Sequence, residues 1–308
     1  MRPIPSLLSF AVALVSPHFS FADDAPVRLS SAHWSGEVAV TVASGDNLSA
    51  IAGRYGTTPS AVAADNGFDL THKLKIGETL KVRFDHLVPS DLPDGITINL
   101  PQRLLYLRKE GELKVWAVAL GKPSWPTPTG VWTVRSREEN KTWVVPKSIQ
   151  AEMAREGKAV KTAVGPGPDN PLGKFWLGLS LPGYGIHGTI APSSIYRFRS
   201  HGCIRMNNDD IADLFPRVVR GTPGQNVYWP VLLEARPDGP VYVEAHADAY
   251  RRAGDRLAAL RQLAEAQGVA TRIDWIRAAQ VIKTSDGVPA DVSLPAASAP
   301  KPAAAGTP

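Results

Sequence analysis

The chain has 308 residues, enough for about two domains, and its hydrophobic content of 44% with 8 tryptophans favours packed cores over disorder. The formal net charge of +5 suits an anionic partner, such as a membrane surface or an acidic polymer. A nucleic-acid partner is not expected, because the basic residues form no dense block. The chain has 1 cysteine, which excludes an internal disulfide.

Residues 1–22 have the features of a secretory signal: a basic start, an apolar run from Leu7 to Val15, and small residues near the end. Cleavage after Ala22 would leave a mature chain that begins at Asp23. The apolar run is short for a bilayer, and no later segment reaches about 18 apolar residues, so the protein is not expected to be membrane-integral. No cysteine follows the cleavage site, so a lipoprotein anchor is not indicated. The sequence predicts export to the periplasm.

Residues 37–84 show a βααβ pattern. The stretch 38–42 alternates and is β-branched, which predicts a strand. Asp46 or Asn47 can cap a helix that follows, and Thr58 or Ser60 can cap a second helix over 59–64. A closing strand is expected within 75–82.

Two stretches of this segment, 45–52 and 76–80, resemble a lysin motif (LysM), which implies recognition of glycan that contains N-acetylglucosamine. Sugar contacts are expected from the loops that flank the helices. The same positions equally suit the core and turns of a small domain. Val40 stands where an aromatic residue is expected, which weakens the expectation of tight binding. The candidate glycan-binding residues are Gly45, Asp46, Asn47, Leu48 and Asn66.

Residues 84–94 contain Pro89 and Pro93 without periodicity, so the sequence predicts a linker. Short β-rich segments follow, which predicts a mainly antiparallel β architecture. Two helices are expected to interrupt it, over 147–156 and about 208–218, the second capped by Asn207 or Asn208. The expected strands cover 96–100, 103–107, 114–120 and 131–134.

The single cysteine, Cys203, lies in the stretch Ser-His-Gly-Cys-Ile-Arg-Met of residues 200–206. An unpaired thiol in an exported protein is a liability unless its reactivity is used, which favours a nucleophile. The alternative is a small buried apolar residue. Gly202 would let backbone approach a ligand, and polar neighbours suit a reactive thiol. Upstream, His187 lies among glycines and could act as the base.

The sequence His-Gly-Thr at 187–189 followed by residues 200–206 closely resembles the catalytic signature of L,D-transpeptidases. The likeness extends to 126–130, 165–173 and 207–210, and it covers roughly 94–232. It implies a β-sandwich-like domain with one catalytic groove, in which Cys203 attacks a peptide carbonyl and His187 is the base. No cofactor and no metal are expected.

The remaining motif residues have supporting roles in this hypothesis. Backbone N–H groups at Gly202 and Cys203 would form the oxyanion hole, and the carbonyl of Gly188 would orient the histidine. Ser200 and Arg205 could contact substrate or brace the loop. His201 is a rival base, disfavoured because its closeness to the cysteine in sequence hinders an in-plane approach.

Beyond residue 230 the resemblance thins. A strand is expected at 241–244, an amphipathic helix over 247–267 and a shorter helix over 272–282. These make a helical C-terminal extension over 233–283. Residues 284–308 are rich in proline and alanine, which predicts a disordered tail.

The resemblance implies an exported enzyme of peptidoglycan synthesis. Its acyl donor would be a tetrapeptide stem that loses its terminal D-alanine, and the acceptor would be the amine of a diaminopimelate in another stem or of a lysine in an outer-membrane lipoprotein. Carbapenems are expected to acylate the same thiol. Two alternatives remain: a thiol-dependent hydrolase of wall peptides, in which water resolves the thioester, and a non-catalytic wall-binding protein.

Overall fold

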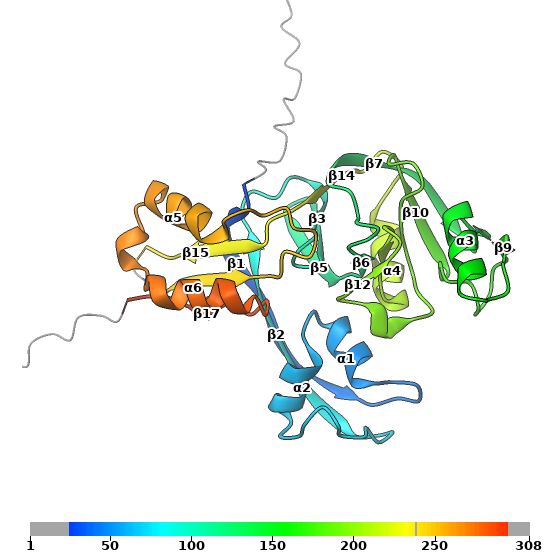
Figure 1. Cartoon of the computed structure of the whole chain (residues 1–308), viewed down its shortest axis with the longest axis horizontal. Helices are drawn as coiled ribbons and strands as arrows, with labels where there is room; N and C mark the ends of the chain where they lie inside the picture. The colour runs from blue at the N-terminus through cyan, green and yellow to red at the C-terminus, as the bar shows by residue number, and fades with distance from the viewer. Residues whose placement is uncertain (1–24, 238, 295–308) are drawn as a thin grey trace, which may run out of the picture.

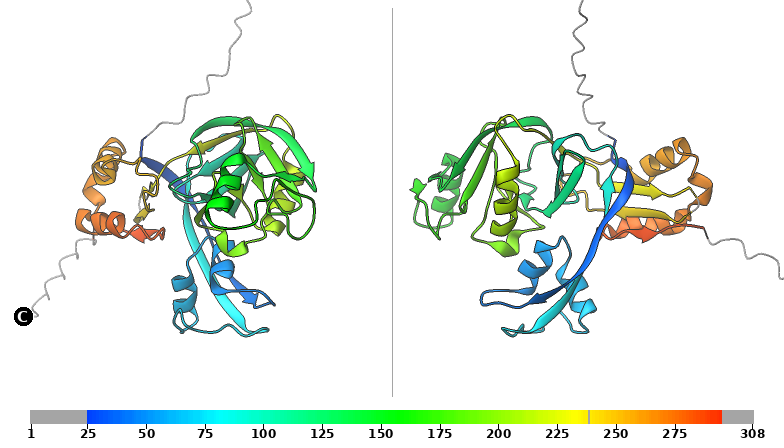
Figure 2. Two further views of the ribbon diagram at one scale, coloured as in Figure 1. Left: turned by 45° about the vertical axis from the view of Figure 1, so that its right-hand side comes forward. Right: turned by 180° about the vertical axis from the view of Figure 1, so that it is seen from behind.

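The computed structural model describes residues 25–237 and 239–294, so the predicted signal segment lies outside the described residues. The fold is mainly β, as the sequence predicts. An eight-stranded sheet forms the central domain, residues 95–229, and a five-stranded C-terminal sheet lies beside it (Figure 1). The N-terminal module, residues 38–83, lies below both (Figure 2).

The central domain has the strand order β13-β11-β10-β7-β14-β3-β4-β5. The four expected strands and both expected helices are present with changed bounds. The strand expected over 114–120 ends at Ala117, the helix expected over about 208–218 ends at Leu214, and the strand expected over 131–134 continues to Glu139. The strands are β3 (Gly95–Asn99), β4 (Leu104–Lys109), β5 (Glu112–Ala117), β7 (Gly130–Glu139), β10 (Phe175–Leu179), β11 (Gly185–His187), β13 (Ile204–Arg205) and β14 (Pro223–Val227). Outside this sheet lie β6 (Leu120–Gly121), β12 (Phe198–Ser200), β8 (Trp143–Val144), β9 (Ala163–Val164), α3 (Lys147–Arg155) and α4 (Asn208–Leu214).

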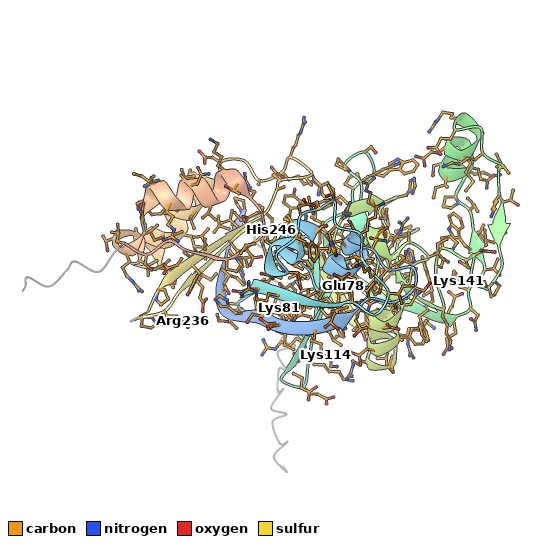
Figure 3. The ribbon with its side chains drawn as sticks, turned by 90° about the horizontal axis from the view of Figure 1, so that it is seen from below. Glu78, Lys81, Lys114, Lys141, Arg236 and His246 are labelled. Carbon is orange, nitrogen blue, oxygen red and sulfur yellow. The ribbon has the colours of Figure 1, made fainter. Side chains whose placement is uncertain are left out.

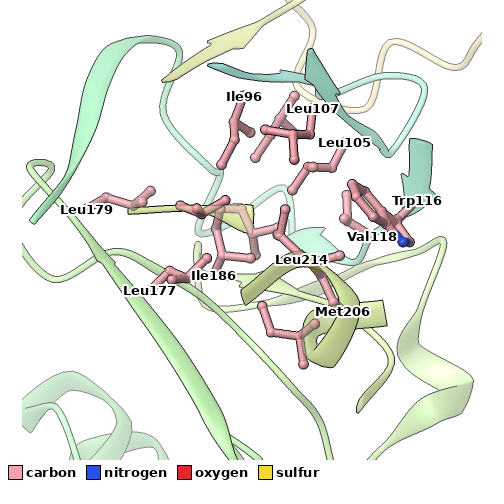
Figure 4. Packing of buried hydrophobic residues seen from close by; sticks show 14 of the residues in the cluster. Ile96, Leu105, Leu107, Trp116, Val118, Leu177, Leu179, Ile186, Met206 and Leu214 are labelled. Carbon is pink, nitrogen blue, oxygen red and sulfur yellow. The ribbon is translucent and has the colours of Figure 1, made fainter. Parts of the chain in front are cut away.

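Inward-facing side chains of this sheet form the largest apolar core. Leu105, Leu177 and Ile186 are fully buried together with residues of α4, such as Leu214 (Figure 4). Burial of such side chains stabilises each by about 1.5–3 kcal/mol relative to exposure. The strands next to the candidate catalytic residues therefore pack against this core through Ile186 and Ile204.

The N-terminal module has the predicted βααβ order, with α1 (Leu48–Arg54) and α2 (Pro59–Asp65) between β1 (Val27–Thr41) and β2 (Thr79–Pro89). The side chain of Asn47 accepts a hydrogen bond from the Ala50 N–H, and Thr58 caps α2 in the same way. These caps confirm the predicted helix starts, because a side-chain oxygen satisfies an N–H that the first helical turn leaves unpaired.

The predicted linker is wrong over residues 84–89. There β2 continues without a break and pairs with β1 from Thr41↔Thr79 to Ser30↔Pro89. This long two-stranded ribbon joins the N-terminal module to the C-terminal sheet (Figure 2). Pro89 is tolerated because β2 is an edge strand of the C-terminal sheet.

The C-terminal sheet has the order β17-β16-β15-β1-β2, with Val27 paired in parallel to Val231. It contains β15 (Val231–Ala235), β16 (Val241–Ala245) and β17 (Ala290–Asp291), and α5 (Arg256–Ala266) and α6 (Trp275–Thr284) pack on it. The predicted strand at 241–244 is confirmed. The C-terminal extension therefore contains both strands and helices, rather than helices alone. Its helices bury their apolar faces against the sheet.

Two predictions for this region are wrong in part. The helix expected over 247–267 begins only at 256, where the side chain of Asp255 accepts from the Ala258 N–H. The disordered tail expected from 284 is ordered as far as 294, because Val292 is fully buried and Leu294 N–H bonds to the carbonyl of Arg272. Residues 295–308 lie outside the described residues.

A buried polar cluster joins the ribbon to the C-terminal sheet. Glu244 Oε1 accepts from His86 Nδ1 at 2.8 Å and from His246 Nε2 at 2.6 Å, and His86 Nε2 bonds to the carbonyl of Gly56 at 2.7 Å. His246 is labelled in Figure 3. Burial opposes ionisation of Glu244, but the two histidines outweigh it and bring its pKa down to about 2. The carboxylate is thus charged and ties three parts of the chain together.

We expect Glu244→Ala to destabilise the protein by about 3–5 kcal/mol, because it leaves two buried histidines without their acceptor. Urea unfolding followed by circular dichroism measures the loss as a lower midpoint. Glu265→Ala, at an exposed position of α5, is the matched control and should stay within about 0.5 kcal/mol. Equal midpoints for the two variants would contradict the role of the cluster.

Candidate active site

Strand pairing places Cys203 beside the strand that ends in His187. β11 pairs in parallel with β13, in the register Ile186↔Ile204 and His187↔Arg205. The N–H of Met206 also donates to the carbonyl of His187 at 2.8 Å. Cys203 immediately precedes β13, so the thiol lies next to the strand that carries the imidazole, although the two residues are sixteen positions apart in the chain.

The ring of His187 is buried and has a defined orientation. Its Nδ1 lies 2.7 Å from the carbonyl oxygen of Gly188 and must donate there, because a carbonyl can only accept. The ring also stacks on Trp176 with centroids 5.7 Å apart. Burial, together with the positive charge of Arg205, lowers the pKa of His187 to about 4. The imidazole is therefore neutral at pH 7, and Nε2 is its free acceptor.

The thiol of Cys203 lies against the turn before β11. Its Sγ lies 3.7 Å from the carbonyl oxygen of Gly183. Burial raises the pKa of this thiol, while the Gly185 N–H and the charge of Arg205 oppose that rise. At pH 7 this side chain is therefore a protonated thiol.

Ser200 and Thr127 hold the loop of residues 200–203, which is called the nucleophile loop after its candidate nucleophile, Cys203. Ser200 Oγ donates to the carbonyl of Cys203 at 2.5 Å and accepts from the Gly202 N–H at 3.0 Å. Thr127 Oγ1 donates to the carbonyl of Gly202 at 2.8 Å. Gly202 has a φ of +102°, and an added Cβ would lie 2.6 Å from the Tyr184 ring. The Gly202 N–H donates to Ser200, whereas no described group accepts a hydrogen bond from the Cys203 N–H.

His201 points to a partner other than the thiol. Its Nε2 lies 2.5 Å from Glu152 Oε2 on α3, and its ring packs on Trp125 with centroids 4.3 Å apart. Lys122 bonds to the same carboxylate at 2.8 Å. His201 therefore links the nucleophile loop to α3, which sequence reasoning did not anticipate.

Comparison with protein families gives two matches. The L,D-transpeptidase catalytic domain matches residues 93–233, and the LysM domain matches residues 40–83. The protein named "Probable L,D-transpeptidase ErfK/SrfK" of Salmonella typhimurium is 34% identical, over 80% of this chain and 81% of that protein. Its Escherichia coli namesake is 31% identical with the same coverage. The chain belongs to the L,D-transpeptidase family. It is accordingly an acyltransferase of peptidoglycan peptides.

Solved structures of the same name are more distant. A mutant L,D-transpeptidase of Enterococcus faecium is 23% identical, with a TM-score of 0.33 over 47% of this chain and 56% of that chain. One from Mycobacterium smegmatis is 15% identical, with a TM-score of 0.34 over 67% of this chain and 95% of that chain. The family assignment therefore rests on the sequence relatives.

This L,D-transpeptidase uses polar contacts that the sequence did not reveal. Tyr250, beyond the matched catalytic domain, donates from its hydroxyl to the carbonyl of Gly121 at 2.7 Å and accepts from the Thr127 N–H at 3.2 Å. It thereby supports the residue that holds Gly202. Asn208 does not cap α4 with its side chain, and neither does Asn207. Instead Asn208 bonds to the N–H and the carbonyl of Thr189.

The candidate glycan-binding residues lie in turns and caps of the N-terminal module. Asp46 accepts from the Ala43 N–H, and the side-chain oxygen of Asn47 caps α1. The amide of Asn66 bonds to Lys81 through both its nitrogen and its oxygen. Gly45 has a φ of +88°, which a turn requires, and Leu48 packs against the module core. Their main-chain contacts are structural, and Asn47 also lines a cleft described below.

One group of described residues has a spacing compatible with a metal ion: the ring nitrogens of His86 and His246 and the carboxylate of Glu244, all within 4.8 Å of one another. This group is not evident from the sequence alone, because His86 and Glu244 lie 158 positions apart in the chain. The carboxylate already accepts from both rings.

Among the described residues, no helix is both long and apolar enough to cross a bilayer.

Proposed function

We propose that this chain is an exported L,D-transpeptidase that uses Cys203 as its nucleophile and His187 as its base. Its donor is a tetrapeptide stem of peptidoglycan, and its acceptor is an amine. The observation that carries the proposal is the hydrogen bond from His187 Nδ1 to the Gly188 carbonyl, which leaves Nε2 to accept the thiol proton.

The reaction proceeds through a thioester. Nε2 of His187 takes the proton of Cys203 as the sulfur attacks the carbonyl before the terminal D-alanine. The Cys203 N–H is available to the developing oxyanion. The C–N bond breaks, and the imidazolium gives its proton to the leaving amine, so that D-alanine departs. The acceptor amine then attacks the thioester, loses a proton to His187, and the thiol re-forms.

The acceptor distinguishes three reactions that the same residues can perform. An amine of diaminopimelate in another stem gives a cross-link, and a lysine of an outer-membrane lipoprotein gives an anchored protein. Water gives hydrolysis, which is the alternative function. The family assignment removes the non-catalytic alternative, because the relatives are transpeptidases by name.

Intact-mass spectrometry with purified tetrapeptide-bearing wall fragments tests the proposal. The protein should gain the mass of an acyl group as D-alanine appears, and an added amine should remove that mass and carry the acyl group itself. A protein that never gains mass contradicts the thioester route. Release of the free acid alone, even with amine in excess, favours the hydrolase.

The proposal includes export and a division of labour along the chain. Residues 1–22 are the signal, 37–84 the glycan-binding module, 94–232 the catalytic domain and 233–283 the C-terminal extension. Peptidoglycan is the partner of the glycan-binding module and of the catalytic domain. Sequencing the amino terminus of the periplasmic protein should give Asp23 as the first residue. A periplasmic protein that retains residues 1–22 contradicts the cleavage.

A further inference from the structure

A cleft between the N-terminal module and the central domain has no assigned role. Its volume is about 510 Å³, within the range of small-molecule sites. Asn47 and Ser49 line it from the start of α1, which lies below β12 in Figure 1. Three arginines line it from the segment that contains the nucleophile: Arg197, Arg199 and Arg205.

The two walls of this cleft are held together by close contacts. Gly53 of α1 packs so tightly on the central domain that an added Cβ would lie 2.6 Å from the carbonyl oxygen of Ile195. Arg197 Nη2 donates to Ser49 Oγ at 2.8 Å. These contacts fix the N-terminal module against the central domain at the cleft.

The arginines of the cleft have no acidic partner. In the described part of the chain, none of the three pairs with a carboxylate, and no acidic residue lines the cleft. The arginines that do pair are Arg83, Arg108, Arg217 and Arg236. A concave site with unpaired guanidinium groups attracts anions, and the planar guanidinium matches a carboxylate with two parallel hydrogen bonds.

We propose that this cleft binds the free carboxylates of a peptidoglycan stem peptide and holds that peptide beside Cys203. Arg199 lies in β12, which leads directly into the nucleophile loop, and Arg205 follows that loop. The inference rests on the proposed function and names the part of the substrate that the site recognises. It also makes the N-terminal module a wall of the peptide site, because Asn47 and Ser49 line the cleft.

Binding to the full chain carrying Cys203→Ala tests this site without any need for catalysis. The probes are one tetrapeptide stem with free carboxylates and the same stem with its carboxylates converted to amides. Arg199 is exposed and bonds to no described side chain, so Arg199→Ala leaves the docking of the module intact. We expect it to raise the Kd for the free-acid stem about fivefold and to leave the Kd for the amidated stem unchanged.

A second measurement, in protein that retains the natural Cys203, identifies whether the cleft holds the donor stem or the acceptor stem. If it holds the donor, Arg199→Ala slows acylation of Cys203 by the free-acid tetrapeptide. If it holds the acceptor, the variant slows transfer from preformed acyl-enzyme to a free-acid stem. Either result supports the proposal. Arg199→Lys, which keeps the charge but not the two parallel bonds, should recover part of the loss.

The matched control is Arg220→Ala, which removes one charge from an exposed position outside the cleft and should change neither Kd. The proposal is overturned if Arg199→Ala leaves the free-acid Kd unchanged, or if it weakens both stems equally. Failure of the proposed function looks different: the Cys203 protein itself would then form no acyl-enzyme, whatever the binding data.

Discussion

Replacing Cys203 with alanine is expected to abolish every covalent adduct with a wall tetrapeptide or a carbapenem. The bond to the acyl carbon forms on the sulfur, and neither water nor another side chain can replace it in a stable thioester. Intact-mass spectrometry after incubation with a carbapenem should show one added mass for the natural protein and none for the variant. An adduct on Cys203→Ala would refute the assignment.

Cys203→Ser refines the same prediction. A hydroxyl is far harder to ionise than a thiol, so proton transfer to the neutral imidazole of His187 is much less favourable. The acylation rate should therefore fall by orders of magnitude. Ser200 still holds the loop through the backbone of residues 202 and 203. The variant should therefore keep the circular dichroism spectrum and the Tm of the natural protein, which separates lost chemistry from lost structure.

His187→Ala is expected to lower the acylation rate by about 10²- to 10⁴-fold, the usual contribution of a positioned base. His201→Ala is the matched control, because it also removes an imidazole, from a residue two positions before Cys203. Its ring nitrogen bonds to Glu152, so its loss should loosen the contact to α3 and cost distinctly less rate. Stopped acylation reactions analysed by mass give both rates. A greater loss from His201→Ala would reverse the assignment.

The pH dependence of acylation gives an independent test of the base. Burial and the charge of Arg205 bring the pKa of His187 to about 4, so the imidazole stays neutral, and able to accept a proton, well below pH 6. The rate should therefore fall with decreasing pH only as pH 4 is approached. An unperturbed imidazole would instead lose half its basic form near pH ~6.5. A midpoint near that value would contradict a buried base.

Local signals in the sequence were enough for several elements of the fold. The caps at Asn47 and Thr58 are where they were expected, because a cap depends on hydrogen bonds within one helical turn. The two segments resembling known families were also identified correctly, since their motifs are continuous in the chain. Such features need no knowledge of distant partners.

Two predictions failed where a distant partner decides the structure. Residues 84–89 looked like a linker because of Pro89, yet they pair with the amino-terminal half of β1. The segment after 284 looked disordered because of its composition, yet Val292 is buried beside β16. Strand pairing is decided by a partner elsewhere in the chain, and a single segment carries little sign of it.

The sequence by itself determined the family and the residue types available for chemistry: one thiol at Cys203 and a histidine among glycines at 187. The tertiary structure alone decided the surroundings of these groups. It made His187 neutral with Nε2 free, directed His201 to Glu152, and brought Arg199 to one cleft with the N-terminal module. The physical reason is that burial, hydrogen bonding and the closeness of charges depend on the three-dimensional arrangement of residues. Residues far apart in the chain come together only when the chain folds.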